Sequence, residues 1–249
     1  MRKAKSPAIG GGSLSDMGSV GTGFQTCPDK PEGLSLHSKE NMKGIFVPFE
    51  GIDASGKTTQ FKKLVNYLKR KKLPVVSFRE PGGEKVSEKI RKILLDSKSS
   101  IDPQTELLLY IASRAQLTFQ KIIPALKIGE IVVCDRFFDS TLAYQGYGRG
   151  IDLRLIETLN RFSTGNLKPD LTILFDVPVK VSLKRAGNKK KDRLEKEGIK
   201  FYQRVREGYL EIAKKEKGRV KIIEGQGGVE EIWGRVKEVG DRFFGIKNL

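Results

Sequence analysis

The sequence predicts an α/β domain built on a parallel sheet, and three observations lead to this prediction. Short apolar runs alternate with longer amphipathic segments along most of the chain, as in folds where strands alternate with helices. A glycine-rich loop stands between the first apolar run and the first amphipathic segment. The length of 249 residues suits one domain with a sizeable core, although two small domains would also fit. We expect a doubly wound fold with helices on both faces of the sheet.

The apolar runs define the strands that we expect in this sheet. They cover residues 45–49, 75–78, 131–134, 171–175 and 220–223, which gives five parallel strands. Apolar residues at helical spacing follow the first run, at Phe61, Leu64, Val65 and Leu68. The same spacing returns near the end of the chain, at Val229, Ile232, Val236, Val239 and Phe243. Both segments are predicted to be helices that pack against the sheet.

Residues 1–41 differ from the remainder of the chain. They are rich in Gly and Ser and carry no sustained hydrophobic period. We expect a disordered extension here, followed by one domain over residues 42–249. The extension could be an expression remnant, a segment upstream of a natural start at Met42, or a targeting segment.

The formal net charge of +17 favours an anionic partner, such as nucleic acid, an acidic membrane surface or a small phosphorylated molecule. Much of this charge lies in lysine-rich runs on predicted helix faces, so we expect a solvated surface and no stable nucleic-acid partner. No run of about 18 apolar residues occurs, so we expect a soluble cytoplasmic protein without a membrane partner. Cys27 and Cys134 are far apart in sequence and suggest neither a disulfide framework nor a cysteine metal site.

The most specific motif is the glycine-rich loop itself. Residues 51–58, Gly-Ile-Asp-Ala-Ser-Gly-Lys-Thr, match the Walker A pattern between a strand and a helix. Gly51 and Gly56 allow backbone amides to turn toward phosphate oxygens, and the helix start adds positive potential. Lys57 is placed to reach the β and γ phosphates, and Thr58 to offer a hydroxyl to magnesium. The loop predicts a P-loop NTPase fold, and the alternative is a glycine-rich turn with an incidental lysine.

A Walker A loop alone indicates only a nucleotide, because GTPases, ATPase motors and small-molecule kinases share it. No Asn-Lys-x-Asp pattern follows the strands, which disfavours a GTPase. Asp135 and Arg136 follow the third strand, at the sheet edge where ligands of such folds bind. Asp135 could hold magnesium through water or orient an acceptor, and Arg136 could clamp a phosphate. A surface salt bridge is the alternative for this pair.

Four segments, taken in order, resemble the thymidylate kinase family. They are residues 49–60 (FEGIDASGKTTQ), 79–83 (REPGG), 113–116 (SRAQ) and 135–146 (DRFFDSTLAYQG), and the resemblance runs over residues 44–245. It implies a five-stranded P-loop kinase with a lid segment, usually a homodimer. It also implies that ATP and magnesium serve as cofactors while dTMP is phosphorylated to dTDP for dTTP synthesis.

The resemblance also implies roles for single residues. The expected ATP contacts are Gly51, Ile52, Asp53, Ala54, Ser55, Gly56, Lys57, Thr58, Thr59 and Arg185. The expected dTMP contacts are Asp53, Glu80, Arg91, Tyr110, Arg114, Arg136, Thr141, Tyr144 and Gln145. The expected metal ligands are Thr58, Asp135 and Glu80, and the expected catalytic residues are Lys57, Asp135, Arg136 and Arg193.

Within the acceptor set, Tyr110 matches the aromatic residue that stacks on thymine, and Arg114, Thr141 and Gln145 match residues that contact the base. Tyr144 is placed to crowd a ribose 2′ hydroxyl. Asp53 matches a carboxylate near the sugar 3′ hydroxyl, with a loop-stabilising Asx turn as the alternative. Arg91 and Arg136 match clamps on the dTMP phosphate, and Glu80 a residue near metal and acceptor. On pattern alone Tyr110 would more often be a core residue, whereas Arg114 in an apolar helix stripe needs a partner.

The transferring group needs further positive charge, and Ala54 stands where some members of the family carry an arginine. Residues 184–193 (LysArgAlaGlyAsnLysLysLysAspArg) resemble the lid of the bacterial-type enzymes. We expect Arg193 to supply the charge, with Arg185 as the second choice and a solvated basic loop as the alternative. Other monophosphate kinases, and a nucleotide-dependent switch or nucleic-acid-binding ATPase, are the competing functions.

Overall fold

The computed structural model of the protein describes residues 43–187 and 192–246. The predicted extension over residues 1–41 lies outside the described residues, as do residues 188–191 of the predicted lid. None of the helices within the described ranges is long and apolar enough to cross a membrane.

The sheet has the five parallel strands that the apolar runs predict. They are β1 (Ile45–Gly51), β2 (Val75–Arg79), β3 (Ile131–Asp135), β4 (Thr172–Asp176) and β5 (Val220–Glu224), in the spatial order β2-β3-β1-β4-β5. Phe49 of the central strand pairs with Asp135 on one side and with Ile173 on the other. The carboxyl ends of β1 and β3 therefore lie side by side, and the phosphate loop leaves β1 next to Asp135.

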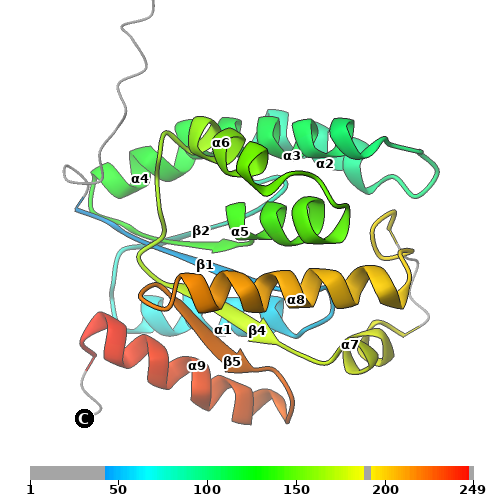
Figure 1. The fold of residues 1–249 in the computed structure, drawn as a ribbon. Helices are drawn as coiled ribbons and strands as arrows, with labels where there is room; N and C mark the ends of the chain where they lie inside the picture. The colour runs from blue at the N-terminus through cyan, green and yellow to red at the C-terminus, as the bar shows by residue number, and fades with distance from the viewer. Residues whose placement is uncertain (1–42, 188–191, 247–249) are drawn as a thin grey trace, which may run out of the picture. The chain divides into compact units, whose positions relative to one another are not determined.

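Alternate residues of each strand pack on opposite faces of the sheet. One face buries Val47 and Phe49 against the helices α1 (Lys57–Arg70) and α9 (Val229–Phe244). The other face buries Phe46 and Cys134 against α3 (Pro103–Leu117), the π-helical turn η2 (Thr118–Ile122) and α4 (Ile123–Lys127). Figure 1 shows these two layers, with the sheet between them. Cys134 is a buried core residue.

The remaining elements surround the carboxyl edge of the sheet or cover the second face. They are α2 (Lys85–Leu95), α5 (Phe138–Thr141), the π-helical turn η3 (Leu142–Gly148), α6 (Leu153–Thr164), α7 (Val179–Ala186) and α8 (Ile199–Lys215). Helix α8 packs closely against η3 and, with it, forms a core cluster on Leu174 of β4. The lid segment that the sequence predicts begins in the last turn of α7, at Lys184.

One detail of the predicted C-terminal helix is wrong. Val229 and Phe243 fall at helical spacing, but they are 52% and 38% exposed. Phe244 packs on the core instead of Phe243. Gly240 lies one helical turn before Phe244 and faces Leu64 of α1, so Phe244 and not Phe243 is on the side of the helix that faces α1.

Candidate nucleotide and acceptor sites

The phosphate loop connects β1 to α1 in the conformation that its glycines allow. Gly51 has φ of 139°, and a Cβ atom there would lie 2.7 Å from the carbonyl oxygen of Phe175 on the neighbouring strand. Gly56 has φ of 91° and precedes the first residue of α1. No side chain caps this helix start, so its first N–H groups are available to an anion.

Lys57 and Thr58 open α1 directly behind the loop. Lys57 is buried, with 6% of its surface exposed. Burial lowers the pKa of its ammonium, and the positive charge of Arg136 lowers it further. The carboxylates of Asp135 and Asp53 raise this pKa but do not outweigh the two other effects. The hydroxyl of Thr58 donates a hydrogen bond to Asp135 Oδ2 at 2.8 Å. The structure thus brings together two of the three predicted metal ligands.

Arg114, on the acceptor side, is almost completely buried, with 1% of its surface exposed. Its Nε and Nη2 atoms both lie 2.8 Å from Glu80 Oε2. Nη1 donates to Thr141 Oγ1 at 2.7 Å and to Asn160 Oδ1 at 2.9 Å. The prediction that this arginine needs a partner is confirmed, and Glu80 is that partner.

Glu80 keeps one oxygen free for another contact. Its Oε1 atom is buried and has no hydrogen-bond partner among the described residues. Burial raises the pKa of Glu80, and the charge of Arg114 acts in the opposite direction. A buried carboxylate oxygen without a partner is costly in the free protein, and it is ready for a ligand group that donates a hydrogen bond or for a cation.

Arg136 and Asp53 join the phosphate loop to the acceptor side. Arg136 Nη2 donates to Asp53 Oδ1 at 2.5 Å and to the hydroxyl of Tyr144 at 3.1 Å. Arg136 Nη1 donates to the carbonyl oxygen of Gly51 at 2.9 Å. Burial would raise the pKa of Asp53, but the positive charges of Arg136 and Lys57 outweigh it and lower the pKa to about 2. Asp53 is therefore ionised at neutral pH.

The predicted dTMP contacts converge on one cavity. It has a volume of about 90 Å³ and lies between the phosphate loop, the end of β2, α2, α3 and the α5–η3 segment. All of the predicted contacts line it except Arg114, which lies behind Thr141; the lining members are Asp53, Glu80, Arg91, Tyr110, Arg136, Thr141, Tyr144 and Gln145. Asp192 and Leu194, from the segment that follows the undescribed part of the lid, also line it.

The two arginines expected to supply charge to the transferring group lie in different places: Arg185 beside the phosphate loop and Arg193 on the acceptor side. Arg185 Nη1 donates to the carbonyl oxygens of Gly225, at 2.8 Å, and of Ser55, at 3.3 Å, so it touches the phosphate loop. Arg193 Nε donates to the Leu94 carbonyl oxygen at 3.1 Å, on the acceptor side. Arg193 is thus held by α2, whereas Arg185 is next to the loop that would bind the ATP phosphates.

Glu50, a buried acid at the end of β1, is not among the residues that the sequence predicts for the site. It accepts hydrogen bonds from Phe137 N at 2.8 Å, Ser140 Oγ at 2.6 Å and Tyr209 Oη at 3.0 Å. Burial raises the pKa of Glu50 to about 7. These bonds hold the turn that begins at Arg136, which has a positive φ of 75°. An acid directly after an apolar strand run was the available signal.

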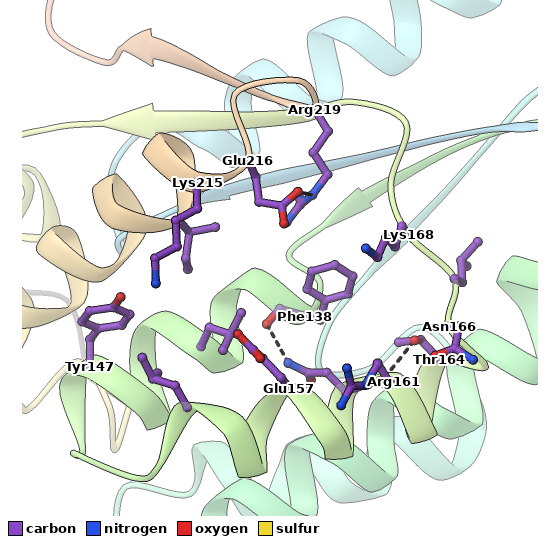
Figure 2. A pocket seen from close by; sticks show the side chains of 15 residues that line it. Phe138, Tyr147, Glu157, Arg161, Thr164, Asn166, Lys168, Lys215, Glu216 and Arg219 are labelled. Carbon is purple, nitrogen blue, oxygen red and sulfur yellow. Dashed lines mark hydrogen bonds and ion pairs between the residues drawn. The ribbon is translucent and has the colours of Figure 1, made fainter.

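A second, larger cavity of about 260 Å³ contains none of the predicted site residues. Figure 2 shows it between α6 and the end of α8, with Phe138 at its inner wall. Asn160, which accepts a hydrogen bond from Arg114, lines this cavity. Arg114 therefore lies between the second cavity and the acceptor cavity.

A strand, a phosphate loop and a helix, with a polar acceptor cavity beside the loop, define a P-loop nucleotide kinase. The family model for thymidylate kinase matches residues 49–235. The chain belongs to the thymidylate kinase family, whose members use ATP as the phosphate donor.

The chain also matches individual thymidylate kinases over nearly the whole length of those proteins. The thymidylate kinase of Kosmotoga olearia is 50% identical over 189 residues, which cover 76% of this chain and 91% of that protein. The thymidylate kinase of Chlorobium luteolum is 48% identical over 210 residues, which cover 80% of this chain and 98% of that protein. The crystal structure of thymidylate kinase from Ehrlichia chaffeensis matches with a TM-score of 0.64 and 38% identity, over 79% of this chain and 98% of that chain.

Proposed function

We propose that the protein transfers the γ-phosphoryl group of ATP to the phosphate of dTMP, which yields ADP and dTDP for dTTP synthesis in the cytoplasm. The observation that carries this proposal is the acceptor cavity beside the phosphate loop. Its walls combine two tyrosines, buried polar groups that can form hydrogen bonds with a ligand, and two arginines. A nucleoside monophosphate has matching parts: a base, a sugar and a phosphate.

On the donor side, the loop amides and Lys57 bind the ATP phosphates in this proposal. Thr58, Asp135 and Glu80 are the proposed magnesium ligands, and the contact of Thr58 with Asp135 supports oxygen ligands at this point. Bound magnesium would supply positive charge to the β and γ phosphates. Within the described ranges no cluster of three or more acidic, His or Cys side chains forms a metal cage, which suits an ion held partly by the nucleotide.

On the acceptor side, Arg91 and Arg136 are the proposed clamps on the dTMP phosphate. Tyr110 stacks on thymine, while Arg114, Thr141 and Gln145 bind its polar edge. Asp53 faces the sugar 3′ hydroxyl, and Tyr144 restricts the space at the 2′ carbon. All of these side chains except Arg114 line one cavity, and Arg114 holds Thr141 at its wall, which supports this assignment.

The chemical step itself requires little proton transfer. The acceptor phosphate is already ionised near neutral pH, so a strong general base is not needed. Catalysis then depends on positioning and on positive charge at the transferring group. The sequence favours Arg193 for this charge, but its contact with α2 turns it to the acceptor side. The contact of Arg185 with Ser55 supports Arg185 in this role.

We also propose a homodimer. The helices α3 and α6 pack against each other and expose large apolar side chains, with Leu108 57%, Leu155 51% and Phe162 63% exposed. Exposed apolar groups gathered on neighbouring helices are typical of protein interfaces. Light scattering at micromolar concentration tests this: a mass near twice 27.8 kDa is expected.

The deciding experiment measures ADP formation from ATP and magnesium with dTMP, dUMP, dGMP, dCMP and AMP as separate acceptors. We expect a strong preference for dTMP in the wild type and its loss in Arg114→Ala. The matched control is Arg70→Ala, an exposed arginine on α1. Preference for another monophosphate would overturn the acceptor assignment, and DNA binding without any turnover would favour the nucleic-acid-binding alternative.

A further inference from the structure

Glu106 is a fully buried carboxylate in the first turn of α3, and the proposed transfer does not use it. It accepts hydrogen bonds from three side chains. Gln145 Nε2 lies at 2.8 Å, Arg149 Nη2 at 3.1 Å and Arg193 Nη1 at 2.5 Å. These partners lie 39, 43 and 87 residues away in sequence, so one side chain connects three separate segments.

Burying a carboxylate is unfavourable unless opposite charges and hydrogen bonds compensate for the lost hydration. Burial opposes the ionisation of Glu106, but the hydrogen bonds from Arg149, Gln145 and Arg193 outweigh it and lower its pKa below the usual range. Glu106 is thus ionised at neutral pH, and both of its oxygens can only accept hydrogen bonds.

This property fixes the orientation of the Gln145 amide. Because an ionised carboxylate only accepts, Gln145 must turn its NH₂ group toward Glu106. Gln145 also lines the acceptor cavity, so its carbonyl oxygen is the atom left for a ligand. A carbonyl oxygen matches the N3–H donor of thymine, whereas N3 of cytosine is an acceptor and would be repelled.

The same carboxylate holds the segment that covers the acceptor cavity. Arg193 lies between Asp192 and Leu194, which both line that cavity. Farther along, Glu197 pairs with Arg149 at 2.5 Å, and Lys196 donates to the Ser97 carbonyl oxygen at 2.7 Å. Residues 192–197 are therefore anchored to Glu106 directly and through Arg149.

We propose that Glu106 is a positioning residue that connects base discrimination with the covering of the acceptor cavity. It sets the Gln145 amide as an acceptor toward the base and fixes residues 192–197 over the cavity through Arg193 and Arg149. This inference rests on the proposed function, since it assumes that a pyrimidine monophosphate occupies the cavity.

The test is a double-mutant cycle on base discrimination. Glutamine at position 106 can donate as well as accept, so in Glu106→Gln the Gln145 amide can reverse. We expect the ratio of kcat/KM for dTMP over dCMP to fall at least about tenfold in Glu106→Gln. In the Gln145→Ala background the same change should leave the ratio unaltered within about twofold. The matched control is Glu157→Gln, an exposed glutamate on α6.

A merely structural role for Glu106 would lower activity on all acceptors equally and leave the ratio unchanged in both backgrounds, which overturns the inference. That result is distinct from failure of the proposed function, in which the wild type itself would not prefer dTMP. If Glu106→Gln does not fold, a second cycle combines Arg193→Ala with Gln145→Ala. We expect their effects on the KM for dTMP to deviate from additivity by at least about fivefold, because both act through Glu106; additive effects would overturn the inference.

Discussion

The phosphate loop and the acceptor cavity lie next to each other but are built in different ways. The loop is one continuous segment whose proposed binding groups are mainly backbone amides and two adjacent side chains, Lys57 and Thr58. The acceptor cavity takes its walls from segments between Asp53 and Leu194. Its side chains are held by buried charges such as Glu80. Damage to the loop should thus affect turnover, whereas damage to the cavity should affect turnover and folding together.

The largest effect is expected for Lys57→Ala. Removal of the ammonium takes positive charge from the ATP phosphates in the transition state, so kcat should fall about 10³-fold or more, roughly 4 kcal/mol. The free energy of unfolding should change little or rise, because the buried charge lowers stability. Steady-state kinetics and urea unfolding measure the two quantities. Lys62→Ala, an exposed lysine on the same helix, is the control.

Arg114→Ala, unlike Lys57→Ala, should strongly lower the free energy of unfolding. The substitution leaves Glu80 and Asn160 buried without their partner, so the free energy of unfolding should fall by about 3–4 kcal/mol. Urea unfolding checks this value, with Arg70→Ala as the control. A stability loss below about 1 kcal/mol would mean that the buried pair does not hold the cavity together.

Glu50→Gln tests the link between the two regions through pH. The pKa of Glu50 is raised to about 7, so between about pH 4.5 and 7 the folded protein keeps a proton that the unfolded chain releases. The contribution of this group to stability is therefore complete below pH 4.5 and falls as pH rises to 7, by about 3 kcal/mol. Glutamine does not titrate, so the variant should lack this decline.

Urea unfolding at pH 4.5 and pH 7.5 measures that difference for wild type and variant. Glu207→Gln, an exposed glutamate on α8, controls for the loss of one charge. An equal decline in wild type and Glu50→Gln would show that other groups cause the pH dependence.

The smallest effects are expected for the two arginines of the predicted lid, whose substitutions should change different kinetic constants. Arg185→Ala should lower kcat about 30-fold, close to 2 kcal/mol, and change the KM for dTMP little, because Arg185 touches the phosphate loop. Arg193→Ala should mainly raise the KM for dTMP, because Arg193 is held on the acceptor side. Steady-state kinetics decides, with Lys184→Ala as the control. The reverse pattern would restore Arg193 as the source of the catalytic charge.

Two buried acids show where prediction from sequence stopped. Glu50 follows an apolar strand, and this position gave a signal that it would be buried. Glu106 gave none, because an acid in the first turn of a helix is ordinarily a solvated residue that complements the helix dipole. Its burial depends on Arg149 and Arg193, which no local pattern connects with it.

The sequence by itself determined the sheet, the phosphate loop and the positions of Asp135 and Arg136 at the sheet edge. These features depend on hydrophobic period and on backbone conformation over a few residues, which the local sequence carries. Only the tertiary structure decided which charges are buried together: Arg114 with Glu80, Arg136 with Asp53, and Glu106 with two arginines. The reason is that the energy of a buried charge depends on partners that chain folding brings from distant segments.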